Sequence, residues 1–545
     1  MKNIKSFWAV LFVFWLISFL LYGDTAGAGF AFDHIGWLQN YIDKGWIGMI
    51  TAFDDKSLHY GYHIIGFIIW KLFGLNGHAW MLLFVTLHAL NASLSFVVFK
   101  RLFKHINGFK QPSLAAFTGS LFFVVSPYQT EPVVWYACIH YLCSVLLLLG
   151  CCISLFQYLL QKKNVFIGLF YLSFTAALFT LEISFAYPVL LLLFFLFWPS
   201  NMLYGSSRLR LLQIFVLPSV ALLLSYFVLS YLLRGSAVGH YGAQAHLNFS
   251  IPLLMANLAK YVSKLFLLTQ FWPYEKRQVI FSFFEQQSFG WSLFSILCLT
   301  AFLFLLMRNS LPKRTQVSVM LFGFFFTALL PTLNLFVTYI VNVEGDRFLY
   351  FPSLFAYQLG AFIIFSLLSY GALLLLPFFL IPNIKYQQYN TQSWIQARNT
   401  RASLLSSFKW WNASRIYLLN NPDNYRGVYM FRCFPPDNLF AETLELTDGK
   451  KLENKVLDTY QYNMISNSDS VTIDIISENE LKVTFAQWGN WWWYKGIGAI
   501  SLSNKMFDAE IDEWSHAYTI RFKNKLPHTV YLYQCGGEWR EVKGF

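Results

Sequence analysis

Long uncharged apolar stretches recur through the first 385 residues of this 545-residue chain. A helix that crosses a bilayer needs about 20 consecutive, mainly apolar residues. Hydrophobic residues make up 56% of the chain and charged residues only 12%, a balance that excludes an ordinary soluble protein. We therefore predict a polytopic α-helical membrane protein.

The uncharged stretches predict where the membrane spans lie. They cover residues 6–22, 78–99, 113–127, 137–160, 165–181, 185–199, 210–233, 289–307, 317–340 and 350–384. The last stretch is too long for one span and short for two, because roughly 20 residues cross the hydrocarbon core. We expect a tight hairpin near residues 369–371. The chain then has about eleven spans and an extracytoplasmic tail, whereas a single span there would put the tail in the cytoplasm.

The N-terminal residues indicate the orientation. Lys2 and Lys5 precede the first span, so the N-terminus is expected in the cytoplasm. A cleaved signal peptide is the alternative, because Ala26-Gly27-Ala28 resembles a cleavage site. In both cases the first outer loop, residues 23–77, faces outside. We expect an integral multi-pass protein, of the plasma or inner membrane in a bacterium.

The charges divide unevenly along the chain. Residues 1–385 hold 23 Lys and Arg against 11 Asp and Glu, and residues 386–545 hold 17 of each kind. The excess positive charge therefore lies among the spans, where basic loops set orientation, and nucleic-acid binding is excluded. All 11 acids lie in or beside predicted outer loops. This distribution indicates carboxylate chemistry on the outer face.

The predicted domain boundary follows residue 385, where Asn, Ser and Asp become more frequent. Residues 1–385 are expected to form the transmembrane domain and residues 386–545 a soluble domain. We expect a short helical linker over residues 392–420 and then, from Asp437, antiparallel strands in a β-sandwich-like domain of about 110 residues. Two features stay open: a bridge between Cys433 and Cys535, and a role in sugar stacking or in core packing for Trp488, Trp491, Trp492, Trp493 and Tyr494.

The first outer loop carries the densest polar chemistry: Asp33, His34, Asp54, Asp55 and His59. Carboxylates at a low-dielectric membrane surface can have a raised pKa and can act as general bases toward a hydroxyl. For any single acid, ordinary solvation in a polar loop is the alternative. For the loop as a whole we favour a functional site.

Ionisable residues also lie at the outer ends of spans: Glu131, Glu182 and Arg347. Such groups are costly in a membrane and usually mark a site or a paired contact. The guanidinium of Arg347 matches phosphate oxygens, so Arg347 is either a phosphate ligand or the salt-bridge partner of Glu131 or Glu182. The two interpretations stay equal, and both can hold in turn.

Four stretches carry a family resemblance: Phe32-Asp33-His34 through Asn40, Gly74 through Asn91, Ser126-Pro127 through Trp135, and Asp346-Arg347 through Ser353. Their order resembles the GT-C superfamily of polyprenyl-phosphate-sugar-dependent glycosyltransferases. The protein O-mannosyltransferase branch, which includes the transmembrane tetratricopeptide O-mannosyltransferases, is the most similar. The chain departs from that branch at His34, where a second acid is common, and in its strand-like tail without tetratricopeptide repeats.

The resemblance implies an inverting transfer of a mannose-like sugar from a polyprenyl-phosphate donor to a protein, lipid or glycan acceptor. Asp33 would be the general base, and Asp54 or Asp55 would orient the acceptor or assist the base. Arg347, with Tyr350, would bind the donor phosphate. His34 would belong to the catalytic group with Asp33, Asp54 and Asp55, and the supporting residues would be Glu131, Glu182, Asp346 and His59. This scheme requires no cofactor, and a divalent metal is left open.

Other functions compete with this interpretation. A lipid-linked oligosaccharide polymerase or ligase would use similar loops and donors, and a non-catalytic sugar or lipid-carrier binder is compatible with His34. A transporter or flippase is disfavoured, because it should carry charged or helix-breaking residues in the middle of spans. The stretch 247–271, which carries Lys260 and Lys264, is expected either in the outer interface beside the lipid carrier or as a buried connecting helix.

Overall fold

The computed structural model describes residues 2–51, 58–198, 205–235, 237, 250–307, 310–333, 345–432, 438–452, 455–486, 490, 492–493 and 500–545. The chain forms two compact units. The membrane unit consists of Met1–Gly23, Trp46–Val134 and Cys138–Asn390. The β unit consists of Asp24–Gly45, Trp135–Ala137 and Thr391–Phe545. Part of the first outer loop therefore belongs to the same unit as the C-terminal strands.

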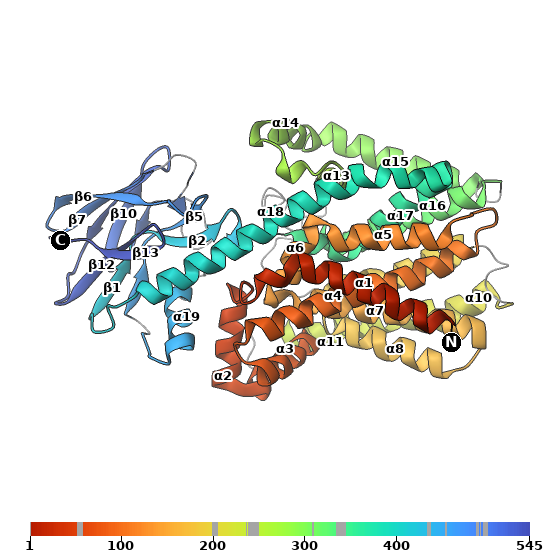
Figure 1. Ribbon diagram of the computed structural model, residues 1–545, viewed down its shortest axis with the longest axis horizontal. Coiled ribbons are helices and arrows are strands. Elements are labelled where there is room, and N and C mark those ends of the chain that lie inside the picture. The colour runs from red at the N-terminus through yellow and green to blue at the C-terminus, as the bar shows by residue number, and fades with distance from the viewer. Residues whose placement is uncertain are drawn as a thin grey trace. The chain divides into compact units, whose positions relative to one another are not determined.

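The membrane unit contains the predicted spans. Seven segments among the described residues are long and apolar enough to cross a membrane: Ser6–Thr25, Gly77–Lys104, Tyr136–Gln161, Arg208–Arg234, Gln287–Met307, Lys313–Thr332 and Asp346–Ser407. Shorter apolar helices cover Pro112–Val125, Val165–Leu178 and Glu182–Phe197. The predicted fold class, a polytopic helical protein with a mainly β C-terminal domain, is confirmed (Figure 1).

The described helices that build the membrane unit are α1 (Lys2–Tyr22), α3 (Tyr60–Phe73), α4 (Gly77–Lys104), α5 (Pro112–Val125), α6 (Thr130–Val134), α7 (Ile139–Gln161), α8 (Val165–Leu178), α9 (Tyr187–Phe197), α10 (Arg208–Leu211), α11 (Leu217–Arg234), α13 (Ile251–Leu267), α14 (Tyr274–Phe284), α15 (Gln287–Met307), α16 (Lys313–Leu329), α17 (Tyr350–Leu368) and most of α18 (Ala372–Ser407). Helix α4 packs against α1, α5 and α7. Asn76 caps the N-terminus of α4, because its side chain accepts a hydrogen bond from the Ala79 N–H at 3.2 Å. The last part of the predicted span 317–340 lies outside the described residues.

The chain reverses direction between α17 and α18, as the hairpin prediction required. Ser369 has φ +52°, a conformation that breaks the helix at the start of the turn Ser369–Gly371. The ring of Phe122 contacts Tyr357 on α17 at 6.1 Å and Phe379 on α18 at 6.3 Å. Residues on either side of the turn therefore lie at the same level of the bundle, which requires two antiparallel helices.

The strands of the β unit form three sheets. A mixed sheet has the order β13 (Glu538–Glu541), β12 (Thr529–Cys535), β1 (Arg415–Leu418), β4 (Val456–Asp458). An antiparallel sheet has the order β6 (Val471–Ser477), β7 (Glu480–Phe485), β11 (Ala517–Phe522), β10 (Phe507–Ile511), β9 (Leu502–Ser503). A third has the order β3 (Val428–Tyr429), β2 (Asn421–Tyr425), β5 (Gln461–Met464), β8 (Trp492–Trp493). Two helices, α2 (Asp33–Thr51) up to its kink at Gly45 and α19 (Leu439–Asp448), complete the unit.

One expectation for the tail was wrong, and one was incomplete. The helix predicted over 392–420 ends at Ser407, and β1 begins at Arg415. Ile416, Tyr417 and Leu418 are fully buried in this strand. The described strands after Asp437 pair with one another in antiparallel fashion, as expected. Two strands that precede Asp437 add parallel pairs that were not expected: β1 with β12 and β4, and β2 with β5. Alternation of apolar and polar residues shows a strand but not the direction of its neighbour.

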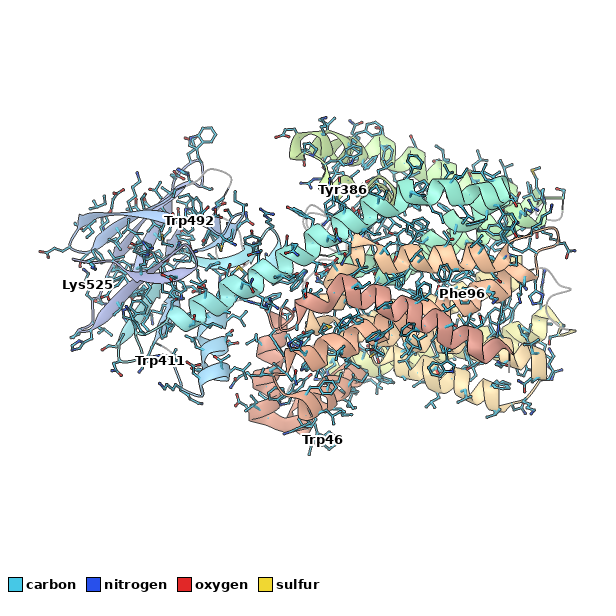
Figure 2. The ribbon with its side chains drawn as sticks, viewed as in Figure 1. Trp46, Phe96, Tyr386, Trp411, Trp492 and Lys525 are labelled. Carbon is cyan, nitrogen blue, oxygen red and sulfur yellow. The ribbon has the colours of Figure 1, made fainter. Side chains whose placement is uncertain are left out.

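The described part of the aromatic cluster in the tail belongs to the core. Trp492, which is labelled in Figure 2, is fully buried. Its ring stacks on that of Phe485 at 4.1 Å and meets that of Tyr518 edge-on at 4.9 Å. Trp488, Trp491 and Tyr494 lie outside the described residues, as does the side chain of Trp493. Cys433 also lies outside them, so the question of a bridge to Cys535 stays open.

Candidate functional site

Glu131 lies in the first turn of the short helix α6, and only 1% of its side chain is exposed. The preceding turn is fixed by Ser126, whose hydroxyl accepts from the Tyr128 N–H at 3.3 Å and from the Tyr357 hydroxyl at 2.7 Å. Pro127 then starts a 3-10 turn that leads directly into α6. These contacts hold a carboxylate inside the helical bundle at a defined place.

Arg347 is the partner of this carboxylate. Its Nη1 donates to Glu131 Oε1 at 2.5 Å, and its backbone N–H donates to Oε2 at 2.8 Å. The Gly345 N–H also points at Oε1, at 3.4 Å, and Gly345 has φ +88°, which a residue with a side chain rarely adopts. One carboxylate therefore accepts from three donors of the turn 345–347. Of the two alternatives for Arg347, the structure contains the ion pair with Glu131.

A second ion pair adjoins the first. Lys264 Nζ of α13 pairs with Asp346 Oδ1, and both side chains are fully buried. The Lys264 ammonium also lies 5.5 Å from the centre of the Tyr128 ring, and the Tyr128 hydroxyl donates to the Lys264 carbonyl. Lys260 is also only 4% exposed, so both lysines of α13 are buried against other parts of the protein.

The two pairs form one network of four charges. Asp346 is the chain neighbour of Arg347 and lies within electrostatic reach of Glu131. Tyr261 lies one turn before Lys264 on α13. It is close enough to interact electrostatically with the charges of Arg347, Asp346 and Glu131. The formal charges of the four residues cancel. Buried charges are tolerated when paired in this way, and removal of one partner typically costs about 3–5 kcal/mol.

Exposure distinguishes the members of this network, which we call the charge quartet (Glu131, Asp346, Lys264 and Arg347). Lys264 and Asp346 have no exposed side-chain surface, Glu131 has 1%, and Arg347 has 13%. Arg347 is therefore the member that an incoming ligand can reach. A guanidinium carries five N–H donors in a planar fork, a geometry that matches phosphate oxygens.

Glu182 and His59 form a separate pair. Glu182 Oε1 lies 2.8 Å from His59 Nε2, which joins the chain before α3 to the turn before α9. The approach is close: the Gly61 N–H donates to the Phe179 carbonyl at 2.8 Å, and a Cβ at Gly61 would lie 2.6 Å from Thr180 Oγ1. The structure brings these two predicted residues together in a contact between the chain before α3 and the turn before α9.

Tyr350 points into the helix core. Its hydroxyl lies 3.0 Å from His88 Nδ1 and accepts from Asn91 Nδ2 at 3.1 Å, and all three side chains are fully buried. This contact fixes the start of α17, three residues after Arg347, against α4. The sequence did contain a signal for it, because His88 and Asn91 stand in the second of the four stretches that carried the resemblance.

Asp33 and His34 belong to the β unit. Asp33 is the first residue of α2, and its side chain is half-buried. His34 is 3% exposed, and its ring contacts those of Phe30 at 5.6 Å, Tyr136 at 5.8 Å and Trp37 at 6.5 Å. Burial lowers the pKa of His34 to about 3, so the imidazole is neutral at neutral pH. His34 is thus an uncharged member of an aromatic cluster.

Two predicted acids are not placed, and no metal cluster is seen in the described part of the chain. Asp54 and Asp55 lie outside the described residues. Among the described residues, no group of three or more His, Cys, Asp or Glu side chains is arranged to hold a metal ion.

Comparison with known proteins gives little beyond this geometry. No family model and no curated protein matches the chain. Among solved structures, the chain is similar to ArnT from Cupriavidus metallidurans in the apo state, with 13% sequence identity over 85% of this chain and 93% of ArnT. The TM-score of that match is 0.30, so we base no argument on it.

Proposed function

We propose that the protein is a membrane glycosyltransferase that takes a sugar, mannose-like by resemblance, from a polyprenyl-phosphate carrier and transfers it to an acceptor hydroxyl on the outer face. The observation that carries the proposal is the charge quartet. It presents one partly exposed guanidinium, Arg347, at the edge of a buried ionic network within a bundle of membrane helices. A lipid phosphate needs such a cation close to the hydrocarbon region.

Arg347 would bind the phosphate of the donor and stabilise it as a leaving group. As the bond between the sugar C1 and the phosphate oxygen breaks, negative charge grows on that oxygen. A cation held in place before the reaction stabilises this charge without having to reorganise. Glu131 fixes the guanidinium through the contacts at 2.5 and 2.8 Å. Lys264, which pairs with Asp346, would add positive electrostatic potential at the bound phosphate.

Asp33 would act as the general base, a role that rests on the resemblance of Phe32-Asp33-His34. The acceptor oxygen attacks C1, its proton passes to the Asp33 carboxylate, and the lipid phosphate leaves with the electron pair of the broken bond. The configuration at C1 inverts. Neighbouring His34 is neutral and buried, so it supplies no charge to this step.

The test is transfer from a panel of radiolabelled polyprenyl-phosphate sugars in proteoliposomes, with the products separated into lipid, protein and glycan fractions. We expect one donor to be used by the wild type. Asp33→Asn should abolish turnover with donor binding retained, and Arg347→Ala should weaken donor binding by on the order of 100-fold, since charge-assisted contacts are the strong ones. Arg521→Gln is the matched control, because that arginine is 67% exposed on the β unit.

The outcomes separate the competing functions. Transfer of a single sugar that survives Arg521→Gln and is lost in Asp33→Asn supports the proposal. Transfer of a whole oligosaccharide identifies a polymerase or ligase. Donor binding without transfer from any carrier identifies a non-catalytic binder and contradicts the proposal.

A further inference from the structure

The segment that carries Asp33 is held by the C-terminal part of its own compact unit. Residues 24–45 and 391–545 fold together in the β unit, although more than 340 residues separate them along the chain. Three contacts fix residues 24–35: one with the end of α18, one with the β2–β3 hairpin and one with α19. Each lies on a different part of the segment.

The first contact holds the turn that precedes Asp33. On α18, Arg398 Nη1 donates to the carbonyls of Asp24 at 3.0 Å and Ala26 at 2.8 Å. Arg401 Nη2 donates to the Ala28 carbonyl at 2.7 Å, and Arg401 is 5% exposed. Two guanidinium groups therefore fix the backbone of residues 24–28 through its carbonyl oxygens.

The second contact holds Phe32, the residue just before Asp33. Phe32 has φ +50°, which costs conformational free energy in a residue with a β-carbon and persists only when surrounding contacts enforce it. Its ring lies 4.9 Å from that of Tyr429 and 6.0 Å from that of Trp135. Tyr429 and Trp135 are themselves 4.6 Å apart, so the three rings form one cluster. The Phe32 carbonyl accepts from the Ile35 N–H at 2.9 Å and so starts α2 at Asp33.

Tyr429 is itself held rigidly. It follows the two-residue turn Arg426-Gly427, whose φ values of +52° and +85° are those of the tight hairpin turn that joins β2 and β3. The Arg432 guanidinium lies 5.0 Å from the centre of the Tyr429 ring. Arg432 in turn makes a bidentate pair with Asp423, with Nε at 3.0 Å from Oδ1 and Nη2 at 2.8 Å from Oδ2. The Tyr429 ring, which packs against Phe32, thus also packs against the guanidinium of Arg432, and the buried ion pair with Asp423 holds that guanidinium in place.

The third contact lies one turn into α2. Ile35 and Leu439 of α19 form a buried apolar cluster, with Phe30, Phe32 and Leu446 packed against it. Helix α19 is therefore the support for the buried face of the first turn of α2. Together the three contacts determine the position and direction of the residue between Phe32 and His34.

We propose that the C-terminal domain is a positioning element for the general base: Tyr429, supported by Arg432 and Asp423, holds Phe32 in its strained conformation and so sets the position of the Asp33 carboxylate. The tail is then a required part of the catalytic apparatus and not an appended module. This inference rests on the proposed function, in which Asp33 is the base. Tyr429 is a positioning residue, because it acts on Asp33 through Phe32.

The test compares Tyr429→Leu with Tyr429→Phe in the full chain, by turnover and by hydrogen exchange. Tyr429→Leu removes the ring, so kcat should fall by about 10- to 100-fold with little change in donor KM, as expected for a misplaced catalytic group. Amides of residues 30–38 should exchange at least several times faster. Tyr429→Phe keeps the ring and should restore both quantities to the wild-type values.

Tyr462→Leu controls for general loss of stability in the domain. Tyr462 is fully buried in the same sheet, on β5, where its ring lies 5.7 Å from Phe485 and 5.8 Å from Trp492. This variant should lower Tm while turnover per folded molecule and exchange at residues 30–38 stay at the wild-type values. Arg432→Lys is a second variant that loses the bidentate contact and should produce a milder form of the Tyr429→Leu effect.

Failure of the inference and failure of the proposed function give different results. If Asp33→Asn abolishes turnover but Tyr429→Leu leaves kcat and exchange at residues 30–38 unchanged, the positioning role is overturned and the base is retained. If Asp33→Asn retains full turnover, the base assignment is overturned and the inference with it. Loss of kcat in Tyr429→Leu, faster exchange at residues 30–38 and rescue by Tyr429→Phe together support the inference.

Discussion

Glu131 accepts hydrogen bonds from both the guanidinium and the backbone N–H of Arg347, at 2.5 and 2.8 Å. The same carboxylate thus fixes the side chain and the start of the turn that leads into α17. An arginine held in this way loses little conformational freedom when a phosphate arrives. The pair is a structural contact, and in the proposed function it is also a prepared anion site. Coupling energies and donor affinities separate these two roles.

The coupling between Glu131 and Arg347 can be measured by a double-mutant cycle. Glu131→Gln and Arg347→Gln should each destabilise the protein, and we expect a coupling of about 1–3 kcal/mol, because the two groups touch and are buried. Denaturation in a fixed detergent gives the free energies. The exposed pair Arg521–Glu480, at 3.2 Å, is the reference and should couple by about 0–1 kcal/mol. Equal coupling in the two cycles would contradict a buried network.

Lys264 and Asp346 should show a strong compensation. Lys264→Met leaves Asp346 buried without its cation and should cost about 3–5 kcal/mol of unfolding free energy. The double variant Lys264→Met/Asp346→Leu should regain most of this loss, since an apolar pair of similar volume can replace a buried ion pair. Thermal unfolding measures both.

Donor binding tells whether the second pair also serves the ligand. If the Lys264–Asp346 pair contributes to phosphate binding, the double variant should bind the donor more weakly than the wild type although it is stable. Wild-type affinity in the double variant would restrict the pair to a structural role. Titration with the polyprenyl-phosphate carrier in nanodiscs gives the dissociation constant.

Tyr350→Phe separates a phosphate ligand from a core contact. The variant leaves the partners of the hydroxyl, His88 and Asn91, without it in a buried site, so unfolding free energy should fall by about 1–3 kcal/mol. Donor KM should stay close to the wild-type value, because the hydroxyl points to α4. A large rise in KM without loss of stability would instead support the phosphate contact that the resemblance implied.

The sequence predicted the parts of the fold that depend on composition and periodicity. Apolar length located the spans, and the excess length of residues 350–384 predicted the hairpin whose turn is Ser369–Gly371. Strand direction was not predictable, because the parallel pairing of β1 with β12 joins segments more than 100 residues apart. Alternation within one strand holds no information on that pairing.

The site was predictable only where a charge stands alone in an apolar segment. Glu131 and Arg347 were found in this way, Asp346 entered through the family resemblance, and the structure joins the three. Lys264 was noticed as a lysine on an apolar helix, but its partner could not be named, because Asp346 lies 82 positions further along the chain. The sequence held no local pattern that indicated the support of Asp33 by Tyr429, because this contact joins two distant segments of the chain.

Acid should destabilise the β unit through His34. The pKa of His34 is about 3 in the folded protein because of burial, whereas an unfolded histidine titrates near 6.5. Between these values the unfolded chain binds more protons than the folded one, so unfolding free energy falls as the pH falls below about 6.5. From pH 7 to pH 5 this single group should lower the free energy of unfolding by about 2 kcal/mol.

His34→Phe removes the titrating group and should flatten that part of the pH profile, while His528→Gln, at an exposed histidine, serves as the matched control. Tryptophan fluorescence during denaturation at pH 5, 6 and 7 measures the slopes, and identical slopes in wild type and His34→Phe would show that His34 does not titrate across unfolding.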